Sequence, residues 1–190
     1  MRRAIVAAAI LFAFALSAAR ADDAGLAALK AGAHVAMIRH GLTTPGSGDP
    51  LGFKLEDCVT QRNLIEEGRE ESRKLGRLLR ERGIAIDRVL SSEWCRCIET
   101  AELIDAGKVE KFRALNNLFG RPQNRAQQVE ELRKLIAAWK GPGNLLLVSH
   151  GSTMGALTGI NPGTAQGVVL LPVQGSADGF RVVGRIGPEG

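Results

Sequence analysis

The chain has 190 residues, 45% of them hydrophobic and 24% charged, which is a globular composition and excludes disordered, fibrous and collagen-like classes. Three of the 25 basic residues lie within the first 21 residues, which contain no acidic side chain, so the other 169 residues carry 22 basic and 20 acidic side chains. A net charge of +2 for this part is too small to indicate nucleic acid as a partner.

The first 21 residues have the features of a secretory signal peptide. They combine a positive start (residues 1–3), an apolar stretch (4–16) and an A-x-A-type cleavage site (19–21). A membrane anchor is the alternative, but the apolar run is shorter than the roughly 20 residues that span the hydrocarbon of a bilayer. We therefore expect a signal peptide over 1–21, one domain over 22–190, no stable membrane anchor after cleavage, and a periplasmic or secreted protein.

The three cysteines, Cys58, Cys95 and Cys97, are an odd number in a compartment that permits disulfides. One bridge and one remaining thiol is the simplest arrangement. Cys95 and Cys97 are too close in sequence to pair comfortably, so Cys58 would pair with one of them. The sequence contains neither a C-x-x-C motif nor a Cys/His cluster with zinc spacing, and it therefore gives little support for a metal site.

In chain order, the first expected element is an apolar strand over residues 33–38, followed by a glycine- and proline-rich loop over 41–50. Asn63, with Glu66 three residues later, has the pattern of a capping box. It predicts a helix that runs to about Arg82, with Gly83 as a C-terminal cap. A second strand is expected over 88–91 and a second helix over about 93–106.

The second half of the chain continues this alternation. A short strand is expected over 109–115, a helix with apolar residues at a helical period over 125–140, and a strand formed by a continuous Leu/Val run over 144–148. Two further strands, 168–173 and 180–186, would pair at the sheet edge. The pattern predicts an α/β protein with three layers, in which helices cover both faces of a mostly parallel sheet.

In such sheets, ligands bind beyond the carboxyl ends of the strands, and polar side chains follow three of the expected strands. Arg39-His40-Gly41 follows the first, Ser91-Ser92 with Arg96 follows the second, and Ser149-His150-Gly151 follows the fourth. Two histidines thus occupy equivalent strand ends, each before a glycine that leaves the ring accessible. His34 begins a strand at the opposite edge, and we interpret it as structural.

Three motifs occur in this order: Arg39-His40-Gly41, Ser91-Ser92-x-x-x-Arg96-x-x-x-Thr100-Ala101, and Ser149-His150-Gly151. Together they resemble the histidine phosphatase superfamily, which has the phosphoglycerate-mutase-like fold. Gln61-Arg62-Asn63-Leu64-x-x-x-Gly68 is similar to the stretch that opens the first helix in that family. The resemblance covers roughly residues 35–171.

The resemblance implies a metal-independent phosphatase without a cofactor, in which His40 is the nucleophile and forms a phosphohistidine. Arg39 and Arg96 would bind the phosphoryl oxygens through forked guanidinium donors, with Arg62 as a further ligand. His150, if cationic, would donate a hydrogen bond to the phosphoryl oxygens, over which negative charge spreads during transfer. The expected substrate is a small-molecule or glycan phosphate, and exported relatives suggest phosphorylated sugars of the cell envelope.

One position departs from the family pattern. Many relatives carry a glutamate, the proton donor to the leaving group, at the position that Asn117 occupies here, and an amide cannot act as a general acid. Glu56 or Asp57 in the loop before Arg62 are candidate donors, and the alternative interpretation of both is an exposed loop charge. A substrate with a good leaving group would need little help. The alternative function is a phosphate- or phosphoglycan-binding protein with an idle catalytic site.

The resemblance also bears on the cysteines. Cys58 lies in the loop that carries Arg62, and Cys95 immediately precedes Arg96. A Cys58–Cys95 bridge would hold both arginine-bearing segments together beside the phosphate site. We prefer this pairing to Cys58–Cys97.

Overall fold

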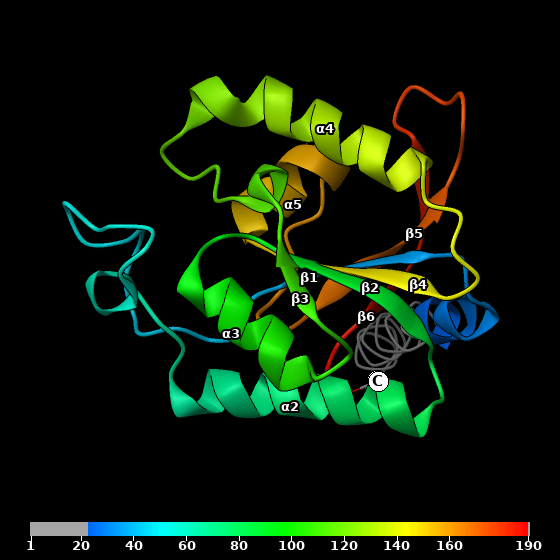
Figure 1. Ribbon diagram of the computed structural model, residues 1–190, viewed down its shortest axis with the longest axis horizontal. Coiled ribbons are helices and arrows are strands. Elements are labelled where there is room, and N and C mark those ends of the chain that lie inside the picture. Colours follow the sequence, from blue (N-terminus) through cyan, green and yellow to red (C-terminus); the bar gives the residue numbers. More distant parts are fainter. Residues whose placement is uncertain (1–22, 190) are drawn as a thin grey trace, which may run out of the picture.

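The computed structural model describes residues 23–189, which form a six-stranded sheet flanked by helices (Figure 1). The expected signal peptide, residues 1–21, lies outside the described residues. The strands are β1 (Val35–Arg39), β2 (Ile86–Ser91), β3 (Val109–Lys111), β4 (Asn144–Ser149), β5 (Gly167–Pro172) and β6 (Phe180–Ile186). The helices are a segment over 23–31, α2 (Glu66–Glu81), α3 (Cys95–Ile104), α4 (Arg125–Ala137) and α5 (Gly151–Thr158).

The strands run in the order β3-β2-β4-β1-β5-β6. The first four are parallel to one another, whereas β5 pairs antiparallel with β1 and β6 pairs antiparallel with β5. The prediction of a mostly parallel sheet is therefore confirmed. Every residue of the central strand β4 is buried, as expected for a parallel strand covered on both faces.

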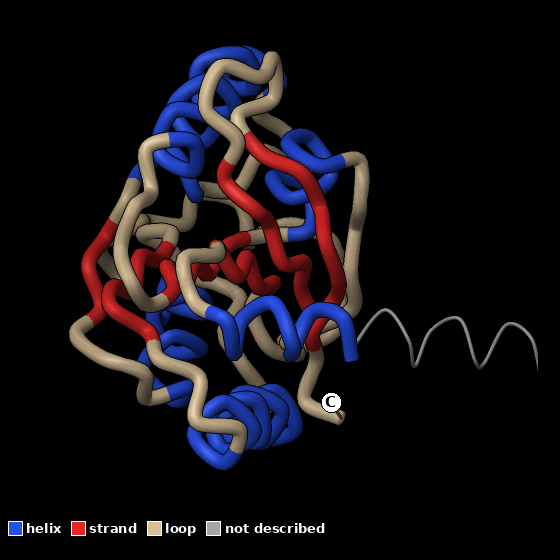
Figure 2. Tube along the Cα trace, turned by 90° about the vertical axis from the view of Figure 1, so that its right-hand side faces the viewer, coloured by secondary structure: helices blue, strands red, loops and turns tan. Residues whose placement is uncertain are grey.

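The two faces of the sheet carry separate apolar cores. Leu146 and Val148 of β4 point into a core shared with α2, α3 and the helix over 23–31, whereas Leu145 and Leu147 point into a core shared with α4 and α5. Alternate residues of a strand face opposite sides, which explains this division. The view turned by 90° shows the helices above and below the sheet (Figure 2). The predicted three-layer arrangement is confirmed.

Helix α2 begins later than the capping-box pattern predicted. Its N-cap is Ile65, which makes no side-chain capping bond, and the Asn63 amide instead donates to the Cys58 carbonyl at 2.6 Å. Leu64 forms an isolated bridge with Thr43, which keeps the backbone after Asn63 extended and delays the helix. The prediction of Asn63 as N-cap was therefore wrong.

The C-terminal cap of α2 is confirmed. Gly83 has a positive φ of 58°, its N–H donates to the Arg80 carbonyl, and the following Ile84 N–H donates to the Leu79 carbonyl. This pair of bonds is a Schellman motif, which glycine forms without a steric cost from a Cβ.

The other differences concern short elements. The strand expected over 109–115 ends at Lys111, and residues 113–115 form a 3-10 turn. The sequence analysis did not predict α5 or the helix over 23–31. Within residues 23–189, none of the helices has the length and apolar character required to cross a bilayer.

Candidate active site

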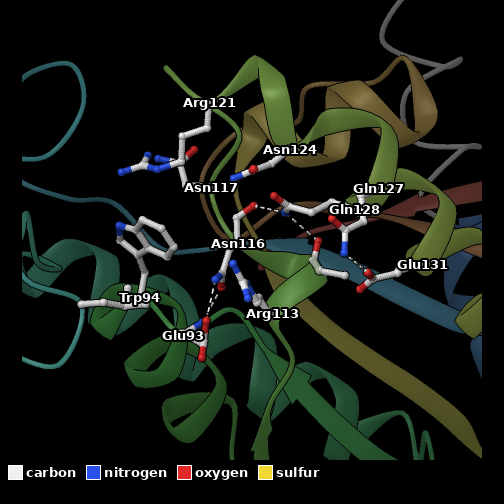
Figure 3. A pocket seen from close by; sticks show the side chains of 12 residues that line it. Glu93, Trp94, Arg113, Asn116, Asn117, Arg121, Asn124, Gln127, Gln128 and Glu131 are labelled. Atoms are coloured by element: carbon white, nitrogen blue, oxygen red, sulfur yellow. Dashed lines mark hydrogen bonds between the residues drawn. The ribbon is translucent and has the colours of Figure 1, made fainter.

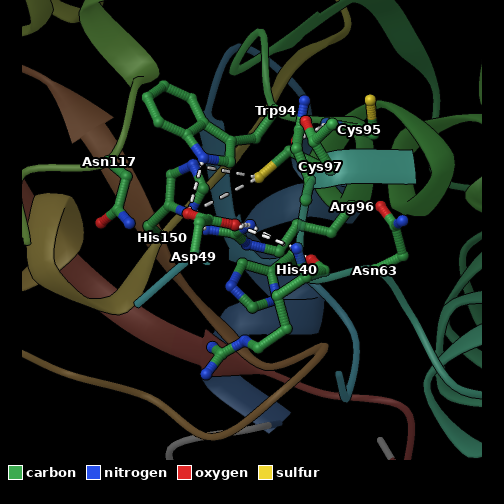
Figure 4. Close-up of polar contacts among 12 residues, drawn as sticks. His40, Asp49, Asn63, Trp94, Cys95, Arg96, Cys97, Asn117 and His150 are labelled. Carbon is green, nitrogen blue, oxygen red and sulfur yellow. Dashed lines mark hydrogen bonds and ion pairs between the residues drawn. The ribbon is translucent and has the colours of Figure 1, made fainter. Parts of the chain in front are cut away.

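The candidate site lies where the parallel strands β1 and β4 end side by side. Arg39 pairs with Ser149 in the sheet register, so the next residues, His40 and His150, leave the same edge as neighbours. The His40 N–H donates to the Ser149 carbonyl at 3.0 Å, and the two imidazole rings are 5.3 Å apart. The histidines that the sequence placed at equivalent strand ends are thus brought together (Figure 4).

The ring of His40 is held in one tautomer. Its Nδ1 lies 2.8 Å from the Gly41 carbonyl oxygen, and because that oxygen only accepts, Nδ1 carries the proton. The other nitrogen, Nε2, then has a free lone pair. Burial, followed by the nearby charge of Arg96, lowers the pKa of His40 from 6.5 to about 3. His40 is therefore a neutral imidazole, the form that acts as a nucleophile.

Three guanidinium groups surround this ring. Arg39, Arg62 and Arg96 line a pocket of about 280 Å3 together with His40 and His150, which we call the His40 pocket. The Nε–H of each of these three arginines is buried and has no protein acceptor among the described residues. The same is true of Arg133, which does not line this pocket. The remaining lining residues are Gly46, Ser47, Gly48, Asn117, Phe119, Gly151, Ser152 and Asn161.

Each arginine is also anchored on the side away from these free donors. Arg39 donates to the Pro162 carbonyl at 2.9 Å, and Arg62 donates to the Gly46 carbonyl. Arg96 forms an ion pair with Asp49 in which both side chains are only 2% exposed. Buried, positively charged donors that lack an acceptor suit a ligand with several anionic oxygens.

The second histidine is buried among polar partners. His150 Nε2 lies 2.9 Å from the Ser92 hydroxyl and 3.4 Å from the Cys97 sulfur. Burial, followed by electrostatic interaction with His40 and Arg96, lowers the pKa of His150 well below its ordinary value. In this structure His150 is therefore neutral, whereas the sequence analysis considered a cationic ring.

The sequence matches the model of the histidine phosphatase superfamily (branch 1) over residues 35–139, more than half of the chain. The chain belongs to the histidine phosphatase superfamily. A search of curated proteins finds no significant match.

Solved structures with the same fold include several phosphatases. A candidate phosphohistidine phosphatase SixA from Agrobacterium tumefaciens is 22% identical, with a TM-score of 0.55 over 80% of this chain and 96% of that chain. A SixA protein histidine phosphatase complexed with tungstate is 20% identical, with a TM-score of 0.53 over 82% and 97%. A mycobacterial glucosyl-3-phosphoglycerate phosphatase complexed with VO3 is 18% identical, with a TM-score of 0.55 over 78% and 95%. At these identities the likeness establishes the fold alone.

The position at which many histidine phosphatases carry a glutamate lies in the pocket wall of this superfamily member. Asn117 is 6% exposed, and its Oδ1 accepts from the Phe119 N–H at 3.1 Å and the Ser152 hydroxyl at 2.7 Å. The candidate donors Glu56 and Asp57 are exposed and do not line the pocket. No carboxylate is among the described residues that line it.

Asp49 is the site residue that sequence reasoning missed. It lies in the glycine-rich loop after β1, where a single aspartate has no periodic or motif context that would single it out. The structure places its carboxylate between Arg96 and the indole N–H of Trp94 (Figure 4). Only the fold of the loop over the start of α3 makes this contact.

The structure pairs Cys58 with Cys95, which of the two pairings considered is the one we preferred. The bridge joins the short 3-10 turn before Arg62 to the first residue of α3, directly before Arg96. Cys97 remains a free, buried thiol. Within residues 23–189, no group of three or more His, Cys, Asp or Glu side chains is arranged to hold a metal ion.

Proposed function

We propose that this protein is an exported, metal-independent phosphatase that hydrolyses a phosphomonoester through a phosphohistidine on His40. This proposal rests on the state of His40, whose Nδ1–H donates to the Gly41 carbonyl beside three arginines with buried Nε–H groups. This arrangement leaves the Nε2 lone pair as the nucleophile. Arg39, Arg62 and Arg96 supply the positive charge that a transferring phosphoryl group requires.

The reaction has two displacements at phosphorus. In the first, His40 Nε2 bonds to phosphorus, the ester P–O bond breaks, and its electron pair goes to the alcohol oxygen, which takes a proton from solvent or an acid. In the second, a water oxygen attacks phosphorus and loses a proton, and the P–N bond breaks. Its electron pair returns to Nε2, so that orthophosphate leaves and neutral His40 is restored.

The pocket wall bears on the choice of substrate. Asn117 occupies the position of the acid, and no carboxylate is among the described residues that line the His40 pocket. These residues therefore provide no carboxylic acid to protonate a poor leaving group. Esters whose leaving group has a low pKa, or a phosphohistidine, should therefore react fastest. The fold shared with SixA, a phosphohistidine phosphatase, agrees with this preference.

A polar hollow beside the His40 pocket supports a hydroxyl-rich alcohol, such as a phosphorylated sugar of the cell envelope. It has a volume of about 440 Å3 and shares Asn117 with the pocket (Figure 3). The side chains of Gln127 and Glu131 on α4, and of Asn124 directly before it, line this hollow. Amides both donate and accept hydrogen bonds, as hydroxyl groups do, and the one aromatic ring, Trp94, is only 4% exposed.

The sequence and the disulfide support export. Residues 1–21 have the pattern of a signal peptide, and the Cys58–Cys95 bridge suits an oxidising compartment. We therefore infer that the protein works in the periplasm or is secreted.

Hydrolysis of p-nitrophenyl phosphate by the chain from Asp22 onward, beside His40→Ala, tests the function. This ester has a good leaving group and does not require an acid. We expect turnover that persists in a metal chelator and falls to background in the variant. Absence of turnover in folded protein that binds vanadate would instead favour a phosphate- or phosphoglycan-binding protein with an idle site, which the amide at Asn117 also suits.

A further inference from the structure

The carboxylate of Asp49 accepts four hydrogen bonds from two separate segments. Oδ1 accepts from Arg96 Nη1 at 2.6 Å and from the Arg62 backbone N–H at 3.1 Å. Oδ2 accepts from the Trp94 indole N–H at 3.0 Å and from Arg96 Nη2 at 3.2 Å. One side chain from the loop after β1 is thus bonded to the start of α3 and to the segment that carries Arg62.

These bonds use one particular edge of the Arg96 guanidinium. Asp49 takes the end of the fork, formed by Nη1 and Nη2, and the Arg62 carbonyl takes the second Nη1–H at 3.2 Å. Nε is buried without an acceptor, and Nη2 donates to Asp49 alone among the described residues. The two N–H groups that remain lie on Nε and Nη2, the lateral edge of the same planar group.

We propose that Asp49 is the residue that positions Arg96 within the phosphate clamp, our name for the guanidinium groups of Arg39, Arg62 and Arg96 in the His40 pocket. By binding the end of the Arg96 fork, it turns the lateral Nε–Nη2 edge toward the His40 pocket, where that edge can grip two phosphoryl oxygens at once. The inference rests on the proposed function, because it assigns the oxyanion that Arg96 receives to the phosphoryl group under attack by His40. Asp49 acts through Arg96 and does not touch the reacting atoms.

The chemistry of the carboxylate argues against a role as the missing acid. Burial acts to raise the pKa of Asp49, but the hydrogen bond and charge of Arg96 outweigh it, and the pKa lies below its ordinary value. An ionised carboxylate whose oxygens each accept two hydrogen bonds has no proton to give to a leaving group. It does have a fixed direction in which to hold a guanidinium.

A double-mutant cycle between Asp49 and Arg96 tests the proposal. The readouts are kcat and KM for p-nitrophenyl phosphate and the Kd for orthovanadate. In wild-type background, Asp49→Asn should lower kcat/KM by about 100-fold, as expected for a misplaced clamp, and weaken vanadate binding. In an Arg96→Ala background, the same change should have less than a twofold effect, because the guanidinium that Asp49 orients is absent.

Asp178→Asn is the matched control, since Asp178 also forms a 2.6 Å ion pair with an arginine, Arg133, but at the surface. It should leave both readouts within twofold of wild type. If Asp49→Asn does not fold, Asp49→Glu keeps the buried charge but displaces the guanidinium, and should weaken vanadate binding while the circular dichroism spectrum stays native. Thermal unfolding of every variant gives the folded fraction used to correct the rates.

Equal losses from Asp49→Asn in both backgrounds would overturn the proposal, because they would show a role in folding alone. An Asp49→Asn variant that binds vanadate with the wild-type Kd would also overturn the proposal. If wild type binds vanadate but does not turn over the ester, the proposed phosphatase function fails, while the vanadate cycle still decides the role of Asp49. If wild type binds no vanadate, both are contradicted.

Discussion

Gly68 of α2 lies directly against the backbone of Leu42, two residues after His40. A Cβ at Gly68 would stand 2.1 Å from the Leu42 carbonyl oxygen and 2.5 Å from its nitrogen. Gly41 is similarly close, since its Cβ would stand 2.3 Å from the Gly68 carbonyl oxygen. The absence of side chains at both positions lets α2 support the loop that holds His40.

Gly68→Ala should therefore lower both stability and activity. The added methyl group meets backbone atoms that have no rotamer to move, so we expect a loss of about 1–3 kcal/mol in unfolding free energy. We also expect a fall in kcat/KM of at least tenfold as His40 shifts. Denaturant unfolding and p-nitrophenyl phosphate kinetics measure the two effects.

The matched control is Gly155→Ala in α5, where an added Cβ has no atom within 4 Å. There the substitution should raise the unfolding free energy by about 0.5–1 kcal/mol, through the lower conformational entropy of the unfolded chain. Wild-type activity in Gly68→Ala would show that the contact with Leu42 does not position His40.

Removal of the disulfide should destabilise the protein and weaken phosphate binding. The bridged cysteines are 37 residues apart, and closing a loop of that length stabilises a fold by about 4 kcal/mol in the chain-entropy model. A Cys58→Ser/Cys95→Ser variant should lose about that much unfolding free energy. Its KM for p-nitrophenyl phosphate should rise, because the segments that carry Arg62 and Arg96 are no longer joined.

Cys97→Ala separates this effect from the loss of any cysteine, since it leaves the bridge intact. Mass mapping of peptides from non-reduced protein checks the pairing directly. A peptide that links Cys58 to Cys97 would contradict the arrangement described here.

The free energy of unfolding should fall as the pH is lowered from above 6.5 toward about 3. His40 has a folded pKa of about 3 against an ordinary value of 6.5, and the pKa of His150 is lowered in the same direction. In this window the unfolded chain binds protons that the folded protein does not, so acid favours unfolding. At pH 5 the loss due to His40 should be ~2 kcal/mol relative to pH 8, and His150 should add to it in the same direction.

Urea unfolding at pH 8 and pH 5 measures this dependence. His40→Asn should remove the part due to His40 and leave the part due to His150. A variant whose stability falls with acid as steeply as that of wild type would show that His40 is not held neutral by the fold.

Cys97 should be inert toward alkylation as long as the protein is folded. Burial, partly offset by the charge of Arg96, raises the pKa of this thiol to about 12. At pH 8 the reactive thiolate is therefore almost absent. Iodoacetamide should label Cys97 in denatured but not in native protein, as read by intact mass, and rapid labelling of native protein would contradict the buried state.

Much of the fold followed from local patterns. The continuous apolar run over 144–148 predicted the central strand β4, because a strand buried on both faces has little room for polar side chains. Gly83 predicted the end of α2, since a left-handed cap position favours glycine. The capping-box pattern at Asn63 failed because a long-range bridge between Thr43 and Leu64 keeps that segment extended. A local pattern does not contain such a pairing.

The sequence by itself determined the type of chemistry. Histidines at the ends of two strands, and arginines beside the first of them and after a third strand, lie in motifs that resemble a known family. They predicted a nucleophile and phosphate ligands at one edge of the sheet, because parallel strands bring their carboxyl ends together. The tertiary structure decided the states of these groups. The neutral rings of His40 and His150 depend on burial, and the Asp49–Arg96 pair joins two distant segments. The pair forms because the loop after β1, which carries Asp49, lies over the start of α3.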